Sequence, residues 1–170
     1  MEVKYIGAVM ILAGCSAGGF YLAGSHRMAE ACLGELIRAL DFMCFELNFR
    51  VLPLPDLISS AGKAIRGPVS KLLHTFSVEL SRQVWEAPDA CMTQVLSQWP
   101  ELPSDTILSL QHLGKTLGNF DLEGQIQGLR RVREHCAYTL DTLRKGREQR
   151  LRSYQTLGVC AGAALAIILL

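Results

Sequence analysis

The sequence predicts an all-α protein, a helical bundle flanked by N- and C-terminal transmembrane helices. Through most of the chain, apolar residues recur at three- and four-residue spacing, the period of a helix with one buried face. Residues 5–25 and 153–170 contain no Asp, Glu, Lys, Arg or His. Because roughly 20 apolar residues of helix span a bilayer, both ends are predicted to cross a membrane.

These patterns divide the chain into three segments. Residues 1–25 are expected to form the N-terminal transmembrane helix and residues 153–170 the C-terminal one. Residues 26–152 are expected to form a cytoplasmic helical bundle domain with a C-terminal stalk. Arg and Lys outnumber the acids in residues 130–152, and basic flanks favour the cytoplasmic side of a membrane span.

In the first half of the bundle, prolines set the expected helix ends. The first helix should follow residue 26 directly and end before Pro53, since proline disfavours helix in the residue that precedes it. A short helix is expected over residues 54–61 and should close near Gly62. Pro68 suits the first turn of the next helix. The apolar residues predicted to face the core in this half are Leu33, Leu36, Ile37, Leu40, Met43, Leu47, Val69, Leu72, Leu73, Phe76, Leu80 and Val84.

The second half is expected to hold three more helices. One opens at Pro88, another begins near Pro103, and Gly118 should close the latter in the left-handed conformation. Asp121 should be the N-cap of a last helix that runs to residue 170, its residues 144–152 being the stalk. The predicted core positions are Cys91, Met92, Val95, Leu96, Ile107, Leu108, Leu110, Leu113, Leu117, Leu129, Val132, Cys136, Leu140 and Leu143.

The sequence contains no motif that indicates catalysis, a metal site or a cofactor. The net charge of +1 provides no basic field for nucleic acid. The six cysteines form no Cys-x-x-Cys pair, and the four histidines are far apart in the sequence. Gly114-Lys115-Thr116 resembles the end of a phosphate-binding loop, but Ser109 stands where that motif requires glycine. We therefore predict a protein that is not an enzyme and binds no cofactor, metal, nucleic acid or small-molecule substrate.

Small residues at both ends support two further hypotheses. Gly14 and Gly18, and likewise Gly158 and Gly162, have the four-residue spacing that lets transmembrane helices approach closely, so they are predicted to pack the spans. Leu12-Ala13-Gly14-Cys15 has the form of a bacterial lipoprotein cleavage box. The alternative to a membrane-spanning protein is therefore an exported lipoprotein with a binding role at the cell envelope.

Residues 113–125, LGKTLGNFDLEGQ, indicate the end of one helix, a tight turn and a capped helix start. This segment resembles the L/F-G-x-T-L-G-x-x-D-x-x-x-Q signature of the stage III sporulation protein AB family. The run Glu46-Leu47-Asn48-Phe49, followed by Pro53-Leu54, is similar to the E-I-x-Y…P-L pattern of that family. The likeness extends over essentially the whole chain.

The resemblance implies a non-enzymatic, membrane-anchored component of the channel or secretion-like complex that joins the mother cell to the developing spore. It implies a location in the mother-cell membrane around the forespore and a fold similar to the cytoplasmic helical domains of the type II secretion F protein. The implied partners are the cytosolic ATPase of the same operon, stage III sporulation protein AA, and other membrane components. Partner contacts are predicted at Glu46, Gly114, Lys115, Gly118, Asp121 and Gln125.

Overall fold

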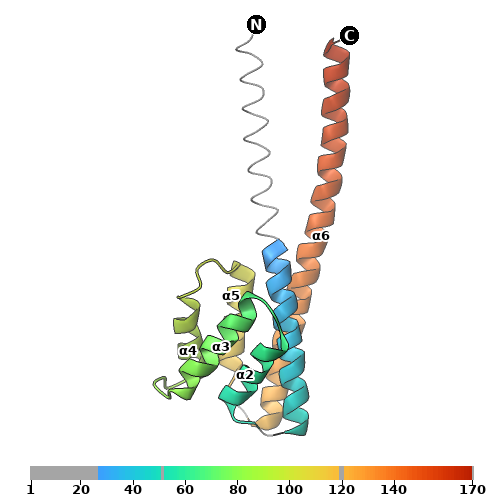
Figure 1. The fold of residues 1–170 in the computed structure, drawn as a ribbon. Coiled ribbons are helices and arrows are strands. Elements are labelled where there is room, and N and C mark those ends of the chain that lie inside the picture. The colour runs from blue at the N-terminus through green and yellow to red at the C-terminus, as the bar shows by residue number, and fades with distance from the viewer. Residues whose placement is uncertain (1–26, 51, 119–120, 170) are drawn as a thin grey trace.

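The computed structural model describes residues 27–50, 52–118 and 121–169, with the side chains of the last helix described as far as residue 146. All regular structure in this part of the chain is helical, as predicted. In Figure 1, α2 to α5 pack against one side of the pair formed by the first helix and α6, and α6 extends well beyond the bundle. The helices cover residues 27–49 (the first helix), α2 Leu54–Ala64, α3 Pro68–Ser81, α4 Pro88–Leu96, α5 Ser104–Thr116 and α6 Leu122–Leu169.

Over the described residues, the prediction of flanking transmembrane helices is wrong. In the part of the chain that the structure describes, no helix combines the length and the apolar character that crossing a membrane requires. The uncharged stretch at the end of α6 starts with the polar or amphipathic residues 153–156, so its apolar portion begins only at Leu157. Absence of charge therefore does not make this stretch apolar throughout.

Some sequence-based expectations fall outside the described residues. The predicted span over residues 1–25, the Gly14 and Gly18 pair, and the lipoprotein box that ends at Cys15 all lie there. Gly158 and Gly162 lie within α6, in the stretch where side chains are not described. The packing role predicted for this second pair therefore stays a prediction.

Prolines open the helices as the sequence predicts. Pro68 and Pro88 are the first residues of α3 and α4, and Pro103 is the residue before α5. Proline is suited to these positions because the first N–H groups of a helix have no partner within it. The predicted end of α2 was too early, since the helix continues through Gly62 to Ala64. Gly62 is buried and brings α2 close to α3, where the Ser70 hydroxyl donates a 2.6 Å hydrogen bond to the Gly62 carbonyl.

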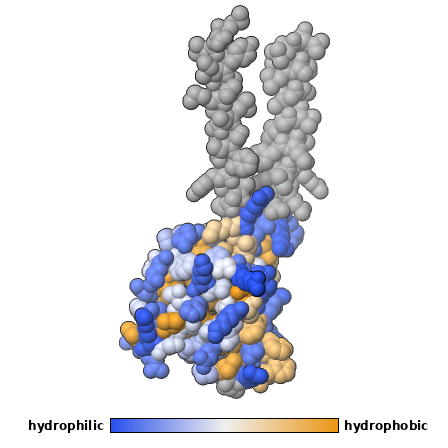
Figure 2. All heavy atoms as spheres, viewed as in Figure 1, coloured by the Kyte–Doolittle hydropathy of each residue, from blue (hydrophilic) through white to orange (hydrophobic). Residues whose placement is uncertain are grey.

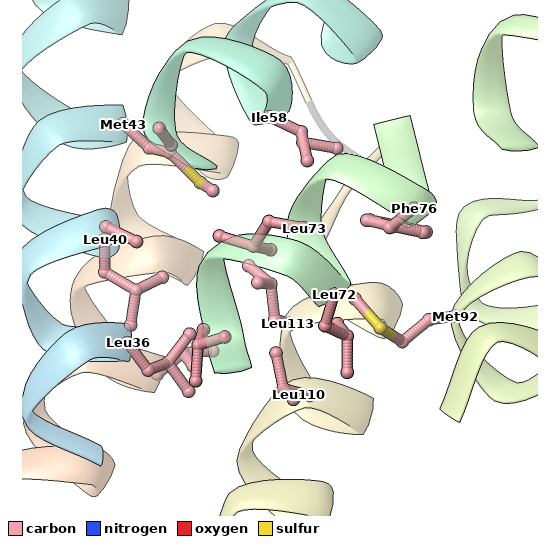
Figure 3. Close-up of a cluster of buried hydrophobic side chains, with 14 of the residues drawn as sticks. Leu36, Leu40, Met43, Ile58, Leu72, Leu73, Phe76, Met92, Leu110 and Leu113 are labelled. Atoms are coloured by element: carbon pink, nitrogen blue, oxygen red, sulfur yellow. The ribbon is translucent and has the colours of Figure 1, made fainter. Parts of the chain in front are cut away.

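A single hydrophobic core fills the space between the helices (Figure 3). It draws side chains from every helix of the bundle, and burial of each large one contributes roughly 1.5–3 kcal/mol. Fully buried examples run from Leu36 and Leu40 on the first helix to Phe76 on α3 and Leu113 on α5. A continuous core of this kind holds the helix ends, and hence the surface described below, in fixed positions.

Two residues predicted for the core are exposed. Val84 has 71% of its surface accessible and lies beyond α3, which ends at Ser81. The chain turns away there because Gln83 takes a left-handed conformation with φ of 54°. Leu108 is 52% accessible on the outer face of α5, while Thr106 and Ser109 occupy buried positions. Thr106 and Ser109 thus occupy core positions on α5, whereas a prediction from apolar residues alone places Leu108 in the core.

Candidate interaction surface

On both sides of residues 119–120, the connection between α5 and α6 has the geometry that the sequence predicts. Gly118 has a φ of 81°, a left-handed conformation that favours glycine, and a Cβ there would lie 2.9 Å from Cγ of Pro88. Asp121 caps α6, since its Oδ1 accepts a 3.1 Å hydrogen bond from the Gly124 N–H. The Gln125 N–H also donates to the Asp121 carbonyl, at 2.9 Å. These contacts fix the N-terminal end of α6.

Glycines on α5 and α6 allow close packing behind this turn. Gly114 is buried, and a Cβ there would lie 2.8 Å from Cβ of Met92 on α4. Gly128 on α6 faces Thr116 on α5, and a Cβ at Gly128 would collide with the Thr116 methyl group. Gly114, predicted as a partner contact, is therefore a buried packing position rather than part of the surface.

The remaining predicted contact residues lie at the surface. Lys115, Gly118 and Asp121 are exposed, whereas Glu46 and Gln125 are half-buried. The last turn of the first helix, which contains Glu46, closes with a 2.7 Å hydrogen bond from the Arg50 N–H to the Glu46 carbonyl. The fold places this turn next to the start of α6. Asn48 shares a shallow groove of about 300 Å³ with Leu122, Glu123, Ile126, Gln127 and Arg130 of α6.

An aromatic pair stands out from the same end of the first helix. Phe45 and Phe49 are 59% and 72% accessible, and their ring centroids lie 4.7 Å apart. Leu122, at the start of α6, is 42% accessible. In the sequence, Phe49 is notable only as part of the family pattern, and Phe45 was not predicted as a contact residue. The signal for the pair was their four-residue spacing outside the apolar stripe of the helix.

We call these residues together, Phe45, Glu46, Asn48, Phe49, Asp121, Leu122 and Gln125, the α6 end surface. It combines an exposed aromatic pair with polar groups on backbone that is capped and packed. Figure 2 shows how polar and apolar side chains mix over the described face of the bundle. Exposed apolar side chains rimmed by polar groups are typical of sites where proteins bind one another.

A second groove runs between α5 and α6 and has a volume of about 390 Å³. His112 and His135, far apart in sequence, are brought together here with ring centroids 5.7 Å apart and planes inclined by 29°. Nothing in the sequence links these two histidines, because only the packing of α5 on α6 brings them together. The lining residues are His112, Lys115 and Thr116 of α5 and Gly128, Arg131, Val132 and His135 of α6. We call this the α5–α6 groove.

The cysteines whose side chains the structure describes have the environment of packing residues. Cys32, Cys91 and Cys136 are buried and Cys44 is half-buried, all four with free thiols. Burial raises the pKa of Cys32 and of Cys91 to about 11. A thiol with so high a pKa is a poor nucleophile at neutral pH. Among the described residues, no three His, Cys, Asp or Glu side chains are grouped so that they could hold a metal ion.

Comparison with known proteins identifies the family. The family model for stage III sporulation protein AB matches residues 4–170. The chain belongs to this family. It is 24% identical over 170 residues to stage III sporulation protein AB of Bacillus subtilis (strain 168), with 99% of each chain covered. The resemblance noted in the sequence is thereby confirmed, and the family fits a component of a sporulation complex.

A solved structure supports the fold. The structure of a stage III sporulation protein AB matches with a TM-score of 0.61 and 21% sequence identity. The match covers 72% of this chain and 98% of the other. This chain therefore shares both sequence similarity and helical architecture with stage III sporulation protein AB.

Proposed function

We propose that this protein is a non-enzymatic docking platform of a sporulation complex and that the α6 end surface binds the cytosolic ATPase, stage III sporulation protein AA. Family membership supports a role in sporulation. The observation that supports docking is the solvent-exposed Phe45–Phe49 pair on the same end of the bundle as the capped start of α6. Aromatic side chains of this kind often provide much of the binding energy of an interface.

The rigidity of this end favours binding. Asp121 accepts a hydrogen bond from the Gly124 N–H at the start of α6, and the core residue Leu47 anchors the last turn of the first helix. A surface that is already ordered loses less conformational entropy when a partner binds. We propose that Glu46, Asp121 and Gln125 supply polar contacts around the two aromatic rings.

In this proposal the bundle acts on the cytoplasmic side of the mother-cell membrane that surrounds the forespore. The other membrane components of the secretion-like complex would hold it there beside the ATPase. Recruitment of a partner to a fixed assembly raises its effective concentration, so that a weak contact becomes sufficient. The platform therefore contributes binding and position, while the partner provides nucleotide hydrolysis.

The experiment that tests the proposal is a direct binding titration between the full-length protein and the purified ATPase. We expect the Phe45→Ser/Phe49→Ser double variant to weaken binding by about 100-fold, since a central aromatic anchor contributes about 2 kcal/mol or more. Val84→Ser is the matched control, because Val84 is equally exposed but lies on the loop after α3. Equal affinities of the wild type and the double variant would contradict the docking role of this surface.

A further inference from the structure

We propose that the α5–α6 groove binds an acidic segment of a partner protein, with carboxylate side chains of that segment lying between the two helices. This inference rests on the proposed docking function and specifies the chemistry of the partner. It differs from the α6 end surface in position, since the groove lies on the α5 side of α6 and the aromatic pair stands on the first helix.

Both walls of the groove carry groups that attract carboxylates. Lys115 and His112 come from α5, and Arg131 and His135 come from α6. None of the described residues that line the groove is acidic. The guanidinium group of Arg131 can form paired hydrogen bonds with a carboxylate, and the lysine ammonium adds positive charge. The groove is therefore complementary in charge to Asp or Glu.

The packing at the floor of the groove does not form a narrow anion-binding pocket. Thr116 packs against Gly128 there, and the Thr116 hydroxyl donates a 2.9 Å hydrogen bond to the His112 carbonyl. The backbone on both sides is helical, so its N–H groups are used within the helices. Recognition depends on side chains spread along two helices, which suits an elongated acidic segment better than a single phosphate group.

Charge reversal in the groove tests the inference. The probe is a fluorescent helical peptide of repeated Glu-Glu-Ala-Ala units, titrated with the full-length protein and compared with a Gln-Gln-Ala-Ala peptide. We expect binding of the Glu peptide only, weakened by added salt and reduced about tenfold or more in the Lys115→Glu/Arg131→Glu double variant. Arg66→Glu/Lys71→Glu is the matched control, because both cations are exposed outside the groove.

A further variant and a folding control keep the test decisive. Lys115→Gln/Arg131→Gln removes the charges without introducing acids, and circular dichroism confirms that each variant is folded. We expect this neutral variant to weaken binding less than the charge reversal does. If the Glu and Gln peptides bind equally, or if the charge reversal leaves binding of the Glu peptide unchanged, the inference is wrong. If vesicles with anionic lipid bind through Lys115 and Arg131 while the Glu peptide does not, the groove is a membrane contact and the inference is also wrong.

The same variants separate the inference from the docking proposal. If the ATPase binds wild-type protein and the Lys115→Glu/Arg131→Glu variant equally, docking stands and the inference about the groove fails. If the Glu peptide binds through Lys115 and Arg131 while the ATPase binds no form of the protein, the chemistry of the groove stands and the proposed partner is wrong. Loss of ATPase binding in the reversal variant, with normal binding by the Arg66→Glu/Lys71→Glu control, supports both.

Discussion

The carboxylate of Glu35 accepts a 3.2 Å hydrogen bond from the backbone N–H of Val69, although the two residues lie on different helices. Glu35 is on the first helix and only 7% of its surface is accessible. Val69 is in the first turn of α3. Gly67, the residue before α3, provides no side-chain cap for this helix. The first helix therefore supplies the cap that α3 lacks, and this contact joins the two helices.

The stability of the protein should depend on the protonation of Glu35. Burial raises the pKa of Glu35 above its ordinary value of 4.5, despite the opposing effects of the Val69 hydrogen bond and the Arg38 charge. The folded state thus binds the Glu35 proton more tightly than the unfolded state does. The stabilisation that comes from protonated Glu35 is therefore complete below the unfolded-state pKa. That contribution is lost as pH rises through the folded-state pKa.

Urea unfolding of wild-type protein and the Glu35→Gln variant between about pH 4 and pH 8 checks this sign. The free energy of unfolding of the wild type should fall relative to the variant as pH rises. Glutamine is the appropriate replacement because its amide oxygen still accepts the hydrogen bond from Val69. A wild-type advantage that grows with pH would contradict the account.

Gly67 is required at the turn that precedes α3. Its φ of 126° is strained for other residues, and a Cβ there would collide with the Glu35 carboxylate. Gly67→Ala should therefore lower the free energy of unfolding by about 3 kcal/mol. Gly34→Ala is the control, since no atom lies within 4 Å of its added Cβ, and it should be neutral or stabilising by about 0.5–1 kcal/mol. Chemical denaturation of both variants measures the difference.

Close packing of α5 on α6 depends on the missing side chain at Gly128. Gly128→Ala should destabilise the protein by about 1–3 kcal/mol, because the new methyl group would collide with the methyl group of Thr116. Thr116→Ser removes that methyl group and keeps the hydroxyl that bonds to His112. Thermal unfolding should show that the double variant is more stable than Gly128→Ala alone. Additive losses in the double variant would exclude this contact as the cause.

The capping role of Asp121 can be measured separately from its proposed contact with the partner. Asp121→Ala should cost about 1 kcal/mol of stability, because the Gly124 N–H loses its acceptor. Asp121→Ser keeps a capping oxygen and should restore most of that loss. If the Asp121 charge also contacts the ATPase, both variants should bind it more weakly. Normal binding by Asp121→Ser would leave Asp121 as a capping residue alone.

The buried cysteines should be protected from alkylation. With pKa values of about 11, the thiols of Cys32 and Cys91 are almost entirely protonated near neutral pH, and both side chains are buried. Mass spectrometry after iodoacetamide treatment should find these positions modified only once the protein is unfolded. The half-buried Cys44 serves as an internal comparison and should react sooner. Rapid modification of Cys91 in folded protein would contradict this packing.

Helix ends were predictable where a residue imposes its own geometry. Pro68 and Pro88 open helices because their fixed φ suits the first turn, and Gly118 takes the left-handed conformation that the chain needs there. Asp121 was predictable as a cap for a similar local reason. Each of these positions depends on backbone chemistry within a few residues, so the sequence alone is sufficient.

Contacts between distant segments were not predictable in this way. Glu35 reads as an ordinary surface carboxylate until the fold places it against Val69. The His112–His135 pair depends on how α5 packs on α6. Gly114, expected to contact a partner, is buried because α4 crosses it at Met92. Over the described residues the membrane prediction was wrong for a different reason, since absence of charge does not make a stretch apolar throughout.

Site-specific photo-crosslinking in sporulating cells tests the central claim most directly. The photoreactive residue p-benzoylphenylalanine would replace Phe45 or Phe49 in the full chain, and Val84 in the matched control. We predict that positions 45 and 49 crosslink to the ATPase, stage III sporulation protein AA, whereas position 84 does not. Crosslinking at position 84 alone, or at none of the three while the protein accumulates normally, would contradict the proposed docking surface.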